Sequence, residues 1–265
     1  MCCANTVSKH NLLILNIMEY NAIFSKRAKS YEYATTKYQH NLKAEFETAV
    51  QMCDLSDNDR LVNIPGACVD LNPYINVNIG FYMPFETCPA LANLFGMPVC
   101  SLSKILMPSK YINTVISLTS LHHSTNDERQ QFYKEVKRIL VLDGKLIIGD
   151  VRRNSNQDRW LNEFVNKYNS NGHRGRFWDD SDISLLNECG FSASTEIKKY
   201  AWKFDNQSDM IDCVKNLFGL DLASDKQILD GLIEFLDVDL DLCKIDWELI
   251  YFIAKVNRTP ALVHP

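Results

Sequence analysis

Short apolar runs bounded by turn residues dominate the middle of the chain, and five of them predict buried strands. Each run is apolar along most of its length, so both of its faces would lie against other parts of the protein. Strands of this kind are typical of a parallel sheet covered by helices. The five runs are residues 60–65, 76–82, 97–102, 112–120 and 144–151.

An amphipathic helix is predicted over residues 125–140, between the last two of these runs. Thr125 and Glu128 have the spacing of a capping box at its start. The turn that follows leaves Gly144 free to take a positive φ. A strand, a helix and a strand in this order predict a right-handed βαβ crossover. The apolar face of the helix consists of Phe132, Val136, Ile139 and Leu140.

Further elements are predicted on both sides of this unit. Residues 10–55 have a helical pattern, in which Tyr31, Tyr33 and Tyr38 could cover the open edge of the sheet. After the fifth run, two helices flank a loop, and Gly190 fits the C-terminal cap of the second helix. A long strand, a pair of amphipathic helices and a final strand follow. These segments are residues 159–168, 172–178, 179–191, 193–204, 206–236 and 246–256.

From Val115 to Val151 the chain resembles the class I S-adenosylmethionine-dependent methyltransferases. Their fourth strand commonly ends in small residues and a stretch like Leu-His-His. A helix, a glycine turn and a fifth strand ending near an acid come next. The resemblance extends more weakly over residues 28–256. It implies a Rossmann-like α/β fold, with a seven-stranded, mostly parallel sheet, an antiparallel last strand and helices on both faces.

The same resemblance implies a domain organisation. Helices between the sixth and seventh strands resemble the lids of small-molecule methyltransferases, which makes a polymer substrate less expected. We therefore expect a helical cap over residues 1–55, a methyltransferase core over 56–204, a helical lid over 205–243 and a closing strand with a tail over 244–265.

S-adenosylmethionine is the cofactor that the resemblance implies, held at the carboxyl ends of the first strands. Family members place acids at the ends of these strands, and this chain has Asn63, Tyr82, and Ser101 or Ser103 there instead; Asn113 replaces a further acid. Losing two charge-assisted hydrogen bonds would weaken affinity about a hundredfold, so we expect weakened or lost cofactor binding. The expected cofactor-binding residues are Tyr31, Asn63, Pro65, Gly66, Ala67, Tyr82, Met83, Ser101, Ser103, Thr119 and Leu121.

His122 and His123 follow the fourth strand, where the resemblance implies the floor of the active site. A histidine there can take a proton from an attacking nucleophile, although one that caps or packs against the next helix would look the same in sequence. We expect substrate contacts from Asp150, His173, Arg174 and Trp178. No group of Cys, His and Asp has the spacing of metal ligands, so no metal site is expected.

Composition and charge limit the partners and the cellular location that we expect. The 265 residues are 46% hydrophobic and 23% charged, with a net charge of -5, which is typical of a soluble protein without a basic surface for nucleic acid. The longest early apolar stretch, residues 12–18, is too short to span a membrane. The chain is therefore expected in the cytoplasm. Nine scattered cysteines without a C-x-x-C motif predict free thiols.

Two classes of function remain open at this point. The first is methyl transfer to a small-molecule acceptor, with secondary metabolites among the candidates. The second is a methyltransferase-like protein that has lost methyl transfer and acts as a binding module or partner subunit, or as a non-methylating enzyme such as a cyclase. A homodimer or a protein partner is compatible with either.

Overall fold

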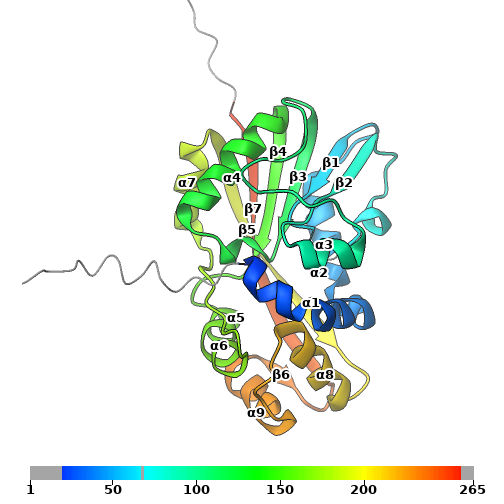
Figure 1. Ribbon diagram of the computed structural model, residues 1–265, viewed down its shortest axis with the longest axis vertical. Coiled ribbons are helices and arrows are strands. Elements are labelled where there is room, and N and C mark those ends of the chain that lie inside the picture. The colour runs from blue at the N-terminus through cyan, green and yellow to red at the C-terminus, as the bar shows by residue number, and fades with distance from the viewer. Residues whose placement is uncertain (1–19, 67–68, 258–265) are drawn as a thin grey trace, which may run out of the picture.

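A seven-stranded sheet between helices forms the body of the protein (Figure 1). The computed structural model describes residues 20–66 and 69–257. The strand order is β2-β1-β3-β4-β7-β5, with β6 paired to β7. Neighbours from β2 to β4 are parallel, whereas β7 runs antiparallel to both β4 and β5. This arrangement confirms the predicted fold class.

The strands are β1 (Arg60–Asn63), β2 (Phe81–Pro84), β3 (Ile112–Leu118), β4 (Leu140–Asp150), β5 (Phe191–Lys203), β6 (Val238–Asp239) and β7 (Lys244–Val256). The helices are α1 (Tyr20–Lys37), α2 (Gln39–Cys53), α3 (Pro89–Phe95), α4 (Asn126–Ile139), α5 (Asn156–Arg159), α6 (Asn166–Tyr168), α7 (Ile183–Glu188), α8 (Gln207–Phe218) and α9 (Asp225–Phe235). A π-helical segment, η4 (Trp160–Val165), joins α5 to α6.

The third predicted strand, residues 97–102, is wrong. This segment makes only isolated bridges, one of which pairs Glu86 with Val99. Pro98 has no N–H to give to a ladder, and Val99 is 47% exposed, so neither the hydrogen bonding nor the burial of a central strand is available. The seventh strand of the sheet is instead β6, which pairs antiparallel with Lys244 and Ile245 at the start of β7.

The apolar side chains of β4 alternate between two cores on opposite faces of the sheet. Leu146 and Ile148 belong to the core beneath α4 and α7, and Ile147 belongs to the core beneath α2. The predicted helix that covers the first core is confirmed, because Thr125 and Glu128 form a complete capping box at the start of α4. Both faces of the strand are therefore buried, as its continuous apolar pattern predicts.

The turn expected at Gly144 differs in the structure. Asp143 and Gly144 both lie within β4, and it is Asp143 that has a positive φ, 62°. A Cβ on Gly144 would lie 2.9 Å from the Val141 carbonyl oxygen, so close approach of the backbone is what favours glycine there. Gly190, by contrast, has φ +87° just after α7, as a C-terminal cap requires.

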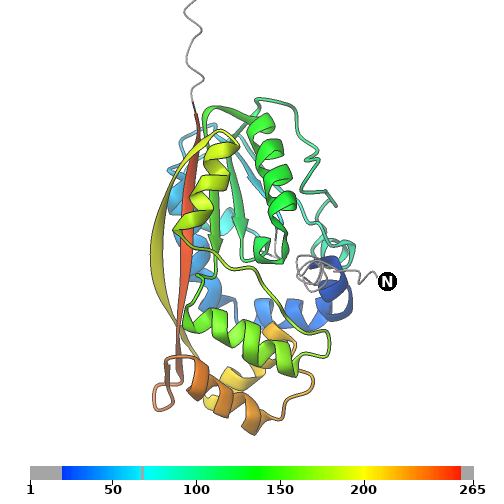
Figure 2. The ribbon, with the colours of Figure 1, turned by 90° about the vertical axis from the view of Figure 1, so that its left-hand side faces the viewer.

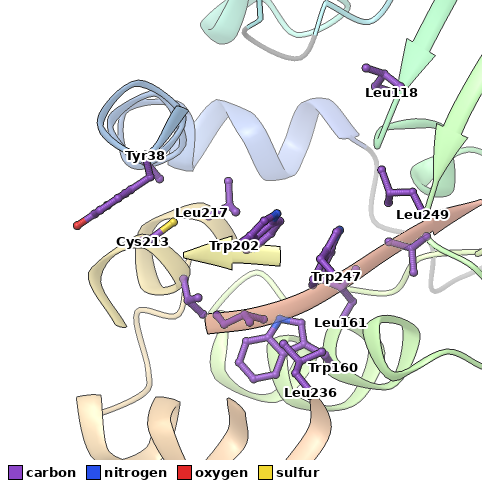
Figure 3. Packing of buried hydrophobic residues seen from close by; sticks show 14 of the residues in the cluster. Tyr38, Leu118, Trp160, Leu161, Trp202, Cys213, Leu217, Leu236, Trp247 and Leu249 are labelled. Atoms are coloured by element: carbon purple, nitrogen blue, oxygen red, sulfur yellow. The ribbon is translucent and has the colours of Figure 1, made fainter. Parts of the chain in front are cut away.

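Strands β5 and β7 continue beyond the rest of the sheet as a two-stranded ribbon (Figure 2). At its far end the rings of Trp202 and Trp247 stack with centroids 4.6 Å apart. Leu217 of α8 and Leu161 of η4 belong to the same buried cluster, which Figure 3 shows. The core beneath α2 therefore continues to this end of the ribbon, where it anchors α8, α9 and the α5–α6 segment.

Helix α1 lies across the carboxyl ends of the strands, packed against α3 and α8 (Figure 1). The hydroxyls of Tyr33 and Tyr38 donate to Asp212 of α8 at 2.9 and 2.7 Å. Tyr33 and Tyr38 therefore lie against α8, whereas we expected their segment to cover the open edge of the sheet. A helical pattern shows that one face is apolar but does not show which surface that face will meet.

The apolar stretch at residues 12–18 lies outside the described residues. Within residues 20–66 and 69–257, none of the helices has the length and apolar character needed to cross a membrane. The cysteines in those ranges are free thiols, and all but Cys243 are buried.

Candidate functional site

A cavity of about 100 Å³ lies at the carboxyl ends of β3 and β4. Thr119 and Val151, which follow these strands, form part of its wall. Helices α1 and α2, segment η4 and the end of α8 enclose it, together with Trp202 and Trp247 of the ribbon. It is smaller than the roughly 300–1,000 Å³ of pockets for drug-sized ligands. The remaining lining residues are Phe24, Arg27, Tyr31, Thr35, Leu42, Glu45, Phe46, Val69, Leu161, Leu217, Phe218 and the three histidines described next.

His122, His123 and His173 meet on one side of this cavity. The first two lie in a single 3₁₀ turn (Leu121–His123) directly after β3, and His173 comes from the loop after α6. Their ring centroids are 4.1 Å (His122 to His123), 5.5 Å (His122 to His173) and 5.1 Å (His123 to His173) apart. All three side chains are buried. The fold thus joins histidines that sequence spacing alone did not group.

Asp150, at the end of β4, fixes the orientation of His122. Its Oδ1 lies 2.8 Å from His122 Nδ1, and its Oδ2 accepts the backbone N–H of His122 at 3.1 Å. A carboxylate can only accept, so Nδ1 of His122 carries the proton and Nε2 is left as an acceptor. Asp150 itself is fully buried. Its position therefore fits a residue that orients His122.

The other two histidines lack such a partner. Nδ1 of His123 and Nδ1 of His173 are buried, and neither has a hydrogen-bond partner among the described residues. Burial, and next the proximity of His122, hold the pKa of both side chains well below its ordinary value of 6.5. Both rings are consequently neutral, with lone pairs available inside the protein.

Thr119 connects β3 to the histidine turn in an unusual backbone conformation. Its φ is +46°, and its N–H donates to the Gly149 carbonyl oxygen at 2.8 Å. A positive φ is unfavourable for a β-branched residue, because its side chain crowds the backbone. The surrounding hydrogen bonds hold this strained conformation at the wall of the cavity, where strain often accompanies function.

Two charged residues of the cavity wall were missed in the sequence. Glu45 is 4% exposed and accepts a hydrogen bond from Trp202 Nε1 at 2.9 Å. Burial raises its pKa to about 8, so it is mostly protonated at neutral pH. Arg27 donates to the carbonyl oxygens of Leu217 and Phe218 at the end of α8. Burial lowers the pKa of its guanidinium to about 10. The sequence contains a signal for Glu45, because this acid lies on the apolar face of its helix between Leu42 and Phe46.

In the loop after β1, one observation favours binding of S-adenosylmethionine, the cofactor that the resemblance implies, and another disfavours it. Asn63 is buried, its Nδ2 lies 3.4 Å from the Gly66 carbonyl oxygen, and its Oδ1 has no partner among the described residues. That free acceptor could meet a ligand's ammonium group. A Cβ on Gly66, however, would lie 2.7 Å from Met97 Sδ, so the chain itself fills the space beside this glycine. Pro65 is buried in the same loop, and Ala67 lies outside the described residues.

The residues expected around the adenosyl group are dispersed. The hydroxyl of Tyr82 accepts the backbone N–H of Leu71 at 3.1 Å, and burial raises its pKa to about 12. Ser101 and Ser103 are exposed and hydrogen-bonded to each other at 3.0 Å, in a separate hollow. Met83 and Leu121 pack in the core beneath α4. Of the expected cofactor residues, Tyr31 and Thr119 line the cavity.

A buried carboxylate near the cofactor end of the sheet was missed. Glu86 is fully buried two residues after β2, and its Oε1 accepts the N–H groups of Thr87 and Cys88 at 2.7 and 2.9 Å. From the family resemblance we expected Tyr82 at the position where family members have the acid of the second strand. Pro84 ends the strand, and the first acid after it is Glu86.

The four expected substrate residues separate in the structure. Asp150 and His173 belong to the histidine group. Arg174 is exposed. Trp178 is fully buried in the core beneath α4, where the Arg129 guanidinium lies 3.7 Å from its ring centroid. The geometry thus gives a structural role to Trp178.

Solved structures with the same fold include methyltransferases, whereas no family model and no curated protein matches the sequence. One is a chain from the complex of the Haloferax volcanii Trm112 methyltransferase activator with a methyltransferase (TM-score 0.59, 12% identity, 91% of this chain and 99% of that chain). Another is a SAM-dependent methyltransferase of Thermotoga maritima (TM-score 0.55, 17% identity, 89% and 99%). A third is geranyl diphosphate C-methyltransferase of Streptomyces coelicolor (TM-score 0.52, 10% identity, 86% and 84%). The chain therefore has the class I S-adenosylmethionine-dependent methyltransferase fold.

Proposed function

We propose that the protein is an S-adenosylmethionine-dependent methyltransferase whose acceptor is a small molecule. The observation that carries this proposal is the enclosed cavity at the carboxyl ends of β3 and β4, where open α/β sheets bind their ligands. Segments from α1, α2, η4 and α8 line it, and a small cavity of this kind suits a small acceptor better than a polymer. The methyltransferases of the same fold support the assignment of the reaction class.

The residues of the cavity can orient an acceptor and accept its proton. The cofactor would supply the activated methyl group. His122, held by Asp150, presents Nε2 as the base for an acceptor O–H or N–H group. Arg27 and Glu45 add a cation and a protonated carboxyl group, which could bind the polar ends of the acceptor. Positioning in an enclosed site then accounts for much of the rate enhancement.

Cofactor contacts are proposed at the ends of the first strands. Asn63 Oδ1 would accept from the ammonium group of the cofactor, and the carboxylate of Glu86, the first acid after β2, is a candidate for its ribose hydroxyls. Tyr82 and Met97 occupy neighbouring space, which predicts weak binding. The proposed affinity is therefore lower than that of a family member with all its acids.

Calorimetric titration with S-adenosylmethionine and S-adenosylhomocysteine tests the proposal, together with transfer of a labelled methyl group to a panel of amines, phenols and carboxylic acids. Asn63→Asp should tighten cofactor binding about tenfold, because the ammonium group would then meet a carboxylate instead of a neutral amide oxygen. Asn113→Asp is the matched control, since Asn113 bonds to Arg60 at the opposite end of the strands. Absence of heat and of a thermal shift at millimolar cofactor would contradict the proposal.

A second candidate is a methyltransferase-like protein that has lost methyl transfer. It is favoured by the hydrogen bond between Tyr82 and Leu71, by the packing of Met97 beside Gly66 and by the small cavity. On this alternative, Asn63→Asp leaves a buried carboxylate without a partner, so the melting temperature falls and no cofactor affinity appears. The two candidates therefore give opposite results with the same variant.

A further inference from the structure

We propose that His122, His123 and His173 form a binding site for a divalent transition metal, Zn²⁺ in the first place. One ring nitrogen from each residue can be chosen so that all three lie within 4.8 Å of one another. Zinc–nitrogen bonds are about 2.0–2.1 Å long, so two nitrogens of a tetrahedral site lie about 3.4 Å apart. Side-chain rotations on binding would have to close this difference. The inference stands on these side chains and does not depend on cofactor binding. An ion bound here would use His122 Nε2 as a ligand, and this nitrogen would then no longer be the base proposed above.

The hydrogen bonding of the three rings favours an ion over simple packing. Buried polar atoms nearly always have a partner, yet Nδ1 of His123 and Nδ1 of His173 have none among the described residues. A shared ion on this side of the cavity would satisfy more than one ring at once. Three neutral imidazoles with an open fourth position are a known ligand set for catalytic zinc.

His122 also has the outer-shell partner that metal-binding histidines usually have. Its Nδ1 donates to Asp150 at 2.8 Å, which directs Nε2 to the ion and makes it a better ligand. Asp150 additionally accepts the N–H groups of His122 and Val151, so its own position is fixed. The carboxylate supplies one negative charge next to the cation.

The other ionisable groups near the three histidines are compatible with a divalent cation whose remaining ligand is an anion. Arg27 is the nearby cation, and its guanidinium is directed to the carbonyl oxygens at the end of α8, where the helix dipole is negative. Glu45 lies on the same cavity wall. The open coordination position would face the cavity, so the fourth ligand is a water, a hydroxide or an oxygen anion of a small molecule.

The test uses the full chain, stripped of metal with a chelator and titrated with Zn²⁺ and with Co²⁺. About one Zn²⁺ should bind per chain and raise the melting temperature, and Co²⁺ should give the visible bands of a tetrahedral nitrogen site. His123→Gln and His173→Gln should weaken Zn²⁺ binding by more than the roughly 10- to 100-fold expected for Asp150→Asn, an outer-shell change. His40→Gln, at an exposed histidine on α2, is the matched control and should bind as the parent does.

Three results would overturn the proposal: substoichiometric zinc in the parent, unchanged affinity in both His123→Gln and His173→Gln, or a Co²⁺ spectrum with thiolate charge-transfer bands. Metal-free variants should melt close to the metal-free parent, because the rings they lose have unpartnered Nδ1 atoms. Should both variants fail to fold, the parent's Co²⁺ spectrum and the affinity of Asp150→Asn decide the matter, since both must then show histidine ligation.

Discussion

Glu45→Gln should make the protein more stable at alkaline pH and leave its stability nearly unchanged in mild acid. The Glu45 carboxyl group is buried with no ion-pair partner among the described residues, and its hydrogen bond comes from Trp202 Nε1 at 2.9 Å. Burial raises its pKa from 4.5 to about 8 in the folded protein. A glutamine keeps the shape of the side chain and the oxygen that accepts the indole N–H, but it cannot ionise.

The sign and size of the effect follow from linkage. Below pH 4.5 the carboxyl group is protonated in both states and contributes its full stability. Between pH 4.5 and about 8 only the unfolded state loses the proton, so stability falls as pH rises, and above about 8 the loss is complete. The difference between the pKa values of 4.5 and about 8 corresponds to an upper bound of roughly 5 kcal/mol on the stability lost. Relaxation of the site and entry of water make about 2–4 kcal/mol a realistic difference between parent and variant.

Urea unfolding followed by tryptophan fluorescence, from pH 5 to pH 9, measures the free energy of unfolding of both proteins. The difference between them cancels all other titrating groups and isolates Glu45. Glu47→Gln is the control, because Glu47 is an exposed acid on the same helix. Two curves that stay parallel across this range would refute a buried, protonated Glu45.

The remaining predictions concern the wall of the site. Tyr82→Phe should lower the free energy of unfolding by about 1 kcal/mol in urea unfolding, since the N–H of Leu71 loses its acceptor, and an unchanged value would show that water replaces the hydroxyl. Gly66→Ala should cost about 1–3 kcal/mol, because its Cβ meets Met97 Sδ, and Met97→Ala should recover most of this cost in a double-mutant cycle; strictly additive losses would contradict the contact. Thr119→Gly should raise the melting temperature or leave it unchanged, as relief of the positive φ offsets the added chain entropy, and a clear fall would show that no strain is stored there.

Local patterns allowed much of the sheet to be predicted. The capping box of α4, the cap at Gly190 and the apolar runs of β3 and β4 depend on neighbours in sequence, and the structure confirms each. The strand at 97–102 failed because Pro98 and the exposed Val99 matter only once the pairing partner is known. The spacing of apolar residues does not identify the strand with which a segment will pair.

The site depended more on contacts between distant segments. His122 and His123 were found next to a strand end, but their meeting with His173 requires the loop after α6 to return over β3. Glu45 and Arg27 reach the cavity only because α1 and α2 cross the carboxyl ends of the strands. Assignment of the second-strand acid to Tyr82 overlooked Glu86, since Pro84 rather than the apolar pattern sets the end of β2.

Several features of the cavity cost folding free energy that a suitable ligand would recover. His123 and His173 each bury a nitrogen without a partner, Glu45 is kept protonated above its ordinary pKa, and Thr119 has a strained backbone. An apolar wall would be more stable in isolation. A ligand that pairs with these groups would recover the cost as affinity and would stabilise the fold by mass action. The metal and the small-molecule acceptor would address different members of this set, the ion the histidines and the acceptor Arg27 and Glu45. Together these proposals describe one site in which a metal-bound oxygen and the polar ends of the acceptor meet at the carboxyl ends of β3 and β4.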